Sequence, residues 1–183
     1  MLPNPLHPII AHFPIVLTVL LPFLVVVALV AIHRGMSSFR TWVGVVVLNV
    51  LLVLSSWTAL VTGEQEEERV EIVVAEQLIE LHEEAAESFM GLTVLVLALA
   101  GVGLLRGRVG NLARAATAIA ALVLLIEGIQ VGHLGGDLVY KYGAGQAYIQ
   151  ATGADMQHPL YGVSESHEDD DVDDDDDDDD DDD

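Results

Sequence analysis

The chain of 183 residues is 52% hydrophobic and yet carries a formal net charge of −22. Of its 29 acidic residues, fifteen lie in residues 168–183 and ten in residues 64–87. Such an apolar body with acidic appendages is unlike an ordinary globular domain, and its charge excludes nucleic acid as a partner. The lack of cysteine excludes disulfides, thiolate metal sites, iron–sulfur clusters and covalently attached c-type haem.

Four apolar segments predict helices that cross a membrane. Residues 13–32, 42–61 and 89–105 contain no charged side chain, and residues 115–131 contain one, Glu127. A hydrocarbon layer about 30 Å thick needs about 20 helical residues, with roughly 17 as the lower limit. We therefore expect an all-α membrane protein, an antiparallel four-transmembrane-helix bundle that occupies residues 1–150.

The distribution of arginine predicts the orientation of this bundle. Arg34 and Arg40 lie in the loop after the first segment, whereas Arg106, Arg108 and Arg114 lie in the loop before the fourth. Positively charged loops are retained in the cytoplasm. The chain is thus expected to be a multi-pass protein of the cell (inner) membrane, with both termini on the outer or periplasmic side.

The acidic segment between the second and third spans has helical periodicity. Apolar residues recur at helical spacing between residues 65 and 87, at Val70, Val74, Leu78, Leu81 and Ala85. This pattern predicts an outer amphipathic helix between spans 2 and 3 that continues into the third span. Residues 151–183, which end in the Asp-rich run, predict a flexible, disordered tail.

A polar stripe marks the packing face of the second span. Trp42, Asn49, Ser56 and Gly63 follow one another at steps of seven residues, so they lie on one side of the helix. Polar residues within a span usually face other helices. We expect this stripe to face the bundle interior, with a hydrogen bond from Asn49 to a neighbouring helix.

Four histidines are expected at the outer end of the bundle, namely His7, His12, His82 and His133. They come from three separate segments of the chain. Residues before proline avoid the helical region, so His7 should be extended, as a lid over the bundle mouth, with regular helix from His12–Phe13 onward. The histidines predict a shared ligand site, although each could instead hydrogen-bond a backbone carbonyl.

Two further residues are expected to support ligating histidines. Glu127 is the only carboxylate within a predicted span, and Tyr140 follows the fourth span. A ligating imidazole needs its other nitrogen held by an acceptor. Glu127 or Tyr140 would fill that role.

The N-terminal stretch His7-Pro8-Ile9-Ile10-Ala11-His12-Phe13-Pro14 resembles the HPxxxHFP opening of a bacterial membrane-protein family, catalogued as domain of unknown function 2231. Thr62-Gly63, His82 and the stretch from His133 to Tyr140 are similar to later features of that family. The resemblance implies a four-span fold. Some members are fused to c-type cytochrome domains, which implies a respiratory or redox setting and haem as a cofactor.

Three functions remain open from the sequence. The first is a haem-b-binding electron-transfer subunit, with two of His12, His82 and His133 as axial ligands and a respiratory or cytochrome c partner on the outer face. The second is a cofactor-free structural or assembly subunit of a membrane complex. The third is a bare zinc, copper or iron site made by the same histidines. No catalytic motif is recognisable, so no catalytic residue is assigned.

Overall fold

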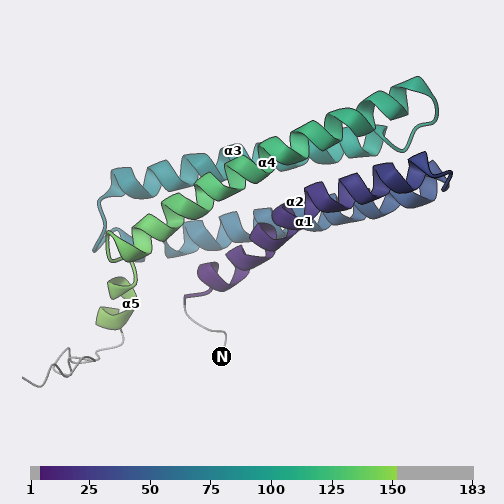
Figure 1. Cartoon of the computed structure of the whole chain (residues 1–183). Coiled ribbons are helices and arrows are strands. Elements are labelled where there is room, and N and C mark those ends of the chain that lie inside the picture. The colour runs from purple at the N-terminus through teal and green to yellow at the C-terminus, as the bar shows by residue number, and fades with distance from the viewer. Residues whose placement is uncertain (1–4, 152–183) are drawn as a thin grey trace, which may run out of the picture. The chain divides into compact units, whose positions relative to one another are not determined.

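The computed structural model describes residues 5–151. These residues form α1 (His7–His33), α2 (Ser38–Val70), α3 (Glu76–Val102), α4 (Arg108–Tyr140) and the short α5 (Gln146–Ala151), with no strand in the described range. The first four helices are long and apolar enough to cross a membrane, and they pack as a bundle (Figure 1). The predicted all-α, four-span architecture is confirmed, whereas the predicted tail lies outside the described residues from 152 onward.

The four long helices form a closed ring. α1 packs against α2 and α4, and α3 packs against the same two helices, so α1 and α3 lie across a diagonal from each other. The α1–α2 and α3–α4 loops lie at one end of the bundle, and the α2–α3 turn and α5 lie at the other (Figure 1). We call these the basic end, which carries Arg34, Arg40 and Arg106, and the acidic end, which carries the Glu-rich residues 64–87.

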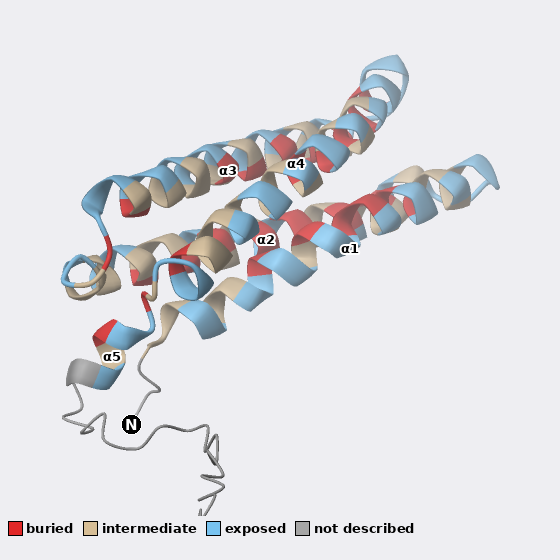
Figure 2. Ribbon diagram, turned by 60° about the vertical axis from the view of Figure 1, so that its left-hand side comes forward, coloured by how far each residue is buried: buried red, intermediate tan, exposed pale blue. Residues whose placement is uncertain are grey.

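Buried residues line the faces that the helices turn toward one another, and the outward faces are mostly exposed (Figure 2). Trp42 and Asn49 are fully buried and Ser56 nearly so, which confirms the predicted packing face of α2. The expected interhelical bond of Asn49 is wrong. Its amide donates to the carbonyl of Val45, 2.8 Å away in the same helix, because that carbonyl lies one turn earlier on the same face.

Trp42 anchors the basic end of the bundle. Its indole N–H donates to the carbonyl of Ala100 at 2.9 Å, which joins α2 to α3. Gly103 lies directly against the indole, because a Cβ placed on this glycine would be 2.4 Å from Nε1 of Trp42. The close approach of the two helices at this level therefore depends on a residue without a side chain.

Arg114 lies inside α4, whereas the sequence analysis placed it in the loop before the fourth span. It is only 3% exposed. Its guanidinium stacks over Trp42, 5.8 Å from the ring centroid, and donates to the carbonyl of Leu105 at 3.0 Å. Leu105 lies three residues beyond the end of α3, so this guanidinium lies near the C-terminus of that helix, where the helix dipole favours a cation. Arg114 thus joins α4 to the Trp42 contact.

The prediction of one continuous outer amphipathic helix over residues 65–87 is wrong. α2 continues to Val70, the chain turns through residues 71–75, and α3 begins at Glu76 and runs on into the third span. The turn contains three successive β-branched residues, which have low helix propensity. One of them is buried in a second hydrophobic cluster, formed by Val74, Ile79, Leu138 and Ala144. The acidic end therefore has a small core of its own.

The first helix begins earlier than expected, at His7 and not near His12–Phe13. Pro8 occupies the first turn, where a helix needs no backbone N–H and the fixed φ of proline is suitable. The carboxylate of Glu66 accepts the backbone N–H groups of Leu6 and His7 at 2.6 and 3.1 Å. These bonds hold His7 in the helix against the usual preference of a residue before proline.

The Gly103→Ala substitution tests the packing at the basic end. Because the new methyl group would overlap the Trp42 indole, we expect it to lower the free energy of unfolding by about 2 kcal/mol. Gly101→Ala is the matched control, since a Cβ on Gly101 has nothing within 4 Å. Thermal unfolding in detergent measures both variants. Equal effects of the two substitutions would contradict the close contact at Gly103.

Candidate functional site

His7 binds α2 through its ring. The side chain is half-buried in the first turn of α1, and its Nδ1 lies 2.8 Å from the carbonyl oxygen of Ala59. Gly63 accommodates the ring, because a Cβ at that position would lie 3.3 Å from it. The hydroxyl of Thr62 is 3.5 Å from the same Nδ1. His7 is therefore part of the α1–α2 contact and not an extended lid.

His82 makes the corresponding contact between α3 and α4. Its half-buried ring lies against Gly135, where a Cβ would be 3.0 Å from the ring Cε1. Its Nδ1 is buried and has no hydrogen-bond partner. Each of the two histidines thus lies against a glycine of the next helix along the chain, His7 against Gly63 and His82 against Gly135.

The two rings meet across the diagonal of the bundle. Their centroids are 6.3 Å apart and their planes are nearly perpendicular, at 81°. The helices that carry them, α1 and α3, make no close backbone approach to each other. The imidazole pair therefore bridges two elements that would otherwise be separated at this end.

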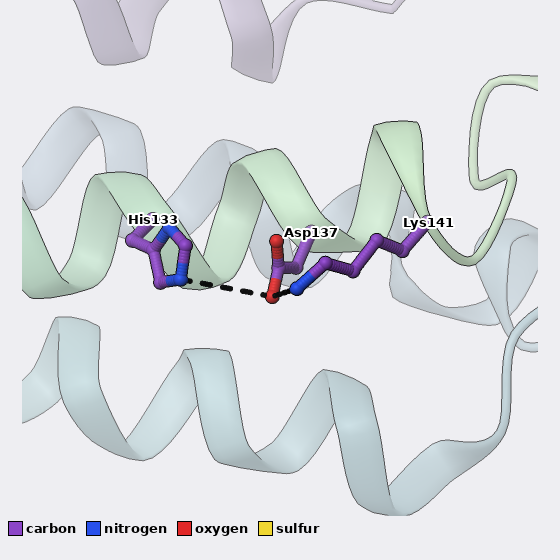
Figure 3. A network of polar contacts seen from close by, with 3 residues as sticks. All are labelled: His133, Asp137 and Lys141. Atoms are coloured by element: carbon purple, nitrogen blue, oxygen red, sulfur yellow. Dashed lines mark hydrogen bonds and ion pairs between the residues drawn. The ribbon is translucent and has the colours of Figure 1, made fainter.

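His12 and His133 do not join this pair. His12 is exposed on α1, and its Nδ1 bonds the carbonyl of Pro8 one turn earlier. The side chain of His133 is 72% exposed, with its Nε2 3.9 Å from an Asp137 oxygen that also binds Lys141 at 2.6 Å. Figure 3 shows these three side chains in a row along α4. Of the four histidines that were expected to converge, only His7 and His82 lie together.

The two residues expected to support the site lie apart from the histidine pair. Tyr140 is 91% exposed at the end of α4. Glu127 is half-buried on α4, and no hydrogen bond or ion pair joins it to a histidine within residues 5–151. The acceptor that holds the His7 ring is a backbone carbonyl group, that of Ala59, which sequence patterns cannot distinguish.

The two rings lie against α2 and α4, at Gly63 and Gly135. Within residues 5–151, no three His, Asp or Glu side chains are grouped to hold a metal ion.

Glu66 is a site residue that the sequence did not single out. One oxygen caps the start of α1, and the other accepts the phenol of Tyr148 in α5 at 2.7 Å. Burial and the hydrogen bond to Glu66 raise the pKa of Tyr148 above its ordinary value, so the phenol stays protonated and donates. Arg69 lies over the Tyr148 ring, 5.4 Å from its centroid. α1, α2 and α5 thus meet at one carboxylate.

A signal for Glu66 was present in the sequence. The stripe on α2 that ends at Gly63 reaches Glu66 within one further turn, so this Glu lies on the packing side of the helix. Its neighbours Glu64 and Glu68 are exposed. Helical position separates Glu66 and Glu67, which are both half-buried, from these exposed neighbours, which composition alone cannot do.

A family model described as a predicted membrane protein, DUF2231, matches residues 3–148. The chain belongs to the DUF2231 family. No curated protein and no solved structure shows a significant match to the chain. The matched range includes the paired His7 and His82 and both glycines on which they rest.

The Glu66→Ala substitution in this DUF2231 protein should destabilise the acidic end. It removes the acceptor of two backbone N–H groups and of the Tyr148 hydroxyl, and we expect a loss of about 2 kcal/mol in the free energy of unfolding. Glu68→Ala is the control, because Glu68 is exposed and should change stability by less than about 0.5 kcal/mol. Chemical unfolding in detergent gives both values, and similar losses for the two would refute the cap.

Proposed function

We propose that the chain is an accessory subunit of a membrane assembly, without catalytic chemistry of its own, whose acidic end binds a basic soluble protein. One observation carries the proposal. Seven of the ten glutamates in residues 64–87 are exposed at this end, namely Glu64, Glu68, Glu71, Glu76, Glu80, Glu84 and Glu87. No ion pair to any of these seven is found within residues 5–151. The sequence adds fifteen acidic residues between 168 and 183.

A concentrated negative field of this kind attracts positively charged partners. Clustered charge of one sign raises association rates by about 10- to 1,000-fold at low ionic strength. It also selects partners, because like charges repel each other across an interface. The second hydrophobic cluster, around Val74 and Leu138, supports the surface on which the glutamates lie.

The arginine loops at the opposite end support an orientation for this subunit. Basic loops are retained in the cytoplasm. The acidic end, with the start of α1 and with α5, would then face the outside of the cell membrane. A partner that docks there is an extracytoplasmic protein, and the redox setting implied by the family resemblance makes a c-type cytochrome the first to test.

The test uses cytochrome c as the basic soluble probe and the full chain in nanodiscs of zwitterionic lipid. We expect saturable binding that weakens steeply as salt rises, because screening acts on exposed charges. A Glu76→Lys, Glu80→Lys, Glu84→Lys triple variant should lose most of the binding, since these glutamates form one row on α3 at steps of four residues.

The control for this experiment removes charge at the other end of the bundle. An Arg106→Gln, Arg108→Gln variant should bind the probe as the unchanged chain does. Binding that is insensitive to salt, or equal in the triple variant and the unchanged chain, would overturn the proposal.

Haem-b electron transfer is the alternative function and stays a prediction. It would require one or both of His12 and His133 to turn inward, away from Pro8 and Asp137. A visible absorption spectrum of protein purified after haem-replete expression tests this alternative. Reduced b-type bands that disappear in His82→Ala would favour haem, and a colourless protein would favour the accessory role.

A further inference from the structure

An open groove runs along the outward face of α1 where the helix ends. It has a volume of about 300 Å³ and is lined by Val26, Val27, Val30, Ala31, Arg34 and Met36. We call it the α1 groove. Its valines are exposed, Val27 to 63%, and belong to neither hydrophobic cluster of the bundle. Because α1 is a membrane span and this face is turned away from the other helices, the groove opens toward lipid.

The end of α1 forms a Schellman motif, which builds one wall of the groove. The N–H of Met36 donates to the carbonyl of Ala31 at 3.1 Å, and the N–H of Gly35 donates to the carbonyl of Ile32 at 3.0 Å. The motif needs a residue in the left-handed conformation, and Gly35 supplies it with a φ of 95°. The chain thereby folds back and brings Met36 against the last turns of the helix.

Arg34 places a positive charge at the polar end of the groove. Val26, Val30 and Arg34 follow one another at steps of four residues, so the guanidinium continues the row of valines. Arg34 is exposed, and neither ion pair found within residues 5–151 involves it. The groove therefore combines an apolar channel with a cation that no carboxylate of the described chain neutralises.

The whole basic end lacks compensating negative charge. The sequence has no Asp or Glu in residues 1–63 or 88–126, which include both loops of this end. A helix of 27 residues, such as α1, separates this end from the Glu-rich end by about 40 Å. That distance is several times the screening length of about 8–10 Å. The charge near the groove is therefore set by the exposed arginines of this end, Arg34, Arg40, Arg106 and Arg108.

An anionic phospholipid has the chemistry that both parts of the groove require. An acyl chain fills an apolar groove that faces the hydrocarbon layer, and a guanidinium binds phosphate oxygens through two parallel N–H groups. A zwitterionic headgroup would bring a second cation to an end that is already positive. A headgroup with a net negative charge neutralises this end, which is why basic residues beside a span favour anionic lipids.

We propose that the α1 groove binds one anionic phospholipid, with an acyl chain along Val26, Val27 and Val30 and the phosphate on Arg34. The bound lipid would hold the end of α1 at the level of the headgroups. The site uses none of the glutamates of the acidic end, so it stands or falls separately from the proposed soluble partner.

The experiment counts the lipids that stay bound to the full chain in native mass spectrometry. The purified chain in detergent is mixed with phosphatidylglycerol or with phosphatidylcholine of the same acyl chains. We expect one phosphatidylglycerol to bind about fivefold more tightly than phosphatidylcholine, the gain that one arginine contact gives. Free glycerol phosphate should not compete with the lipid, because it has no acyl chain to fill the groove.

Two pairs of variants locate the site. Arg34→Gln should weaken phosphatidylglycerol binding about fivefold. Arg108→Gln removes an exposed arginine of the same end, outside the groove, and should leave the binding nearly unchanged. Val27→Trp should fill the groove and weaken the binding, whereas Val16→Trp adds the same ring at an exposed position of α1 outside the groove and should not. Because all four side chains are exposed, each variant should fold, and thermal unfolding in detergent checks this.

Each result supports or overturns the proposal. Equal binding of the two lipids overturns it. Equal effects of Arg34→Gln and Arg108→Gln also overturn it, because the charge of the whole end, and not the groove, would then attract the lipid. Competition by glycerol phosphate, or unchanged binding in Val27→Trp, would contradict a site that holds the acyl chain.

Discussion

The contact between His7 and His82 links the two helix hairpins at the acidic end, as the contacts of Trp42 with Ala100 and Arg114 do at the basic end. Within a membrane, apolar side chains gain little by leaving lipid for protein, so association depends on close packing and on polar contacts. Both requirements are met here. Gly63 and Gly135 let the rings approach the backbones of α2 and α4, and the carbonyl group of Ala59 holds His7 in place. The position of the candidate site follows from this packing.

Different side chains join the helices at the two ends of the bundle. At the basic end an indole, a buried guanidinium and Gly103 join α2, α3 and α4. At the acidic end two imidazoles and two glycines join all four long helices. Each arrangement leaves one buried nitrogen without a hydrogen-bond partner, Nε of Arg114 at the basic end and Nδ1 of His82 at the acidic end, whereas the indole N–H of Trp42 is satisfied.

The hydrogen bonds that cap the start of α1 determine where His7 lies relative to His82. Glu66 holds the N–H groups of Leu6 and His7, which starts the helix early enough to bring His7 opposite His82. Tyr148 in turn binds the second oxygen of Glu66. A helix that began five residues later would have left His7 outside the bundle. One carboxylate on α2 thus determines where a side chain of α1 meets α3.

The apolar runs predicted the four spans, and the seven-residue stripe predicted the inner face of α2, because length and periodicity depend only on local sequence. The site was predicted less well. Membrane depth brought His7, His12, His82 and His133 to one level, but depth does not determine which side of a helix faces inward. His12 and His133 point outward for that reason. The break at residues 71–75 and the cap by Glu66 depend on tertiary contacts, which no local pattern encodes.

The most direct test of this account is magic-angle-spinning NMR of the full chain in lipid bilayers, with only histidine labelled by ¹³C and ¹⁵N. Single His→Gln variants assign the seven ring systems. We expect a through-space cross-peak between the His7 and His82 rings, with Nδ1 protonated in His7 because it donates to the Ala59 carbonyl. A cross-peak between His12 and His133, or the absence of any contact between His7 and His82, would contradict it.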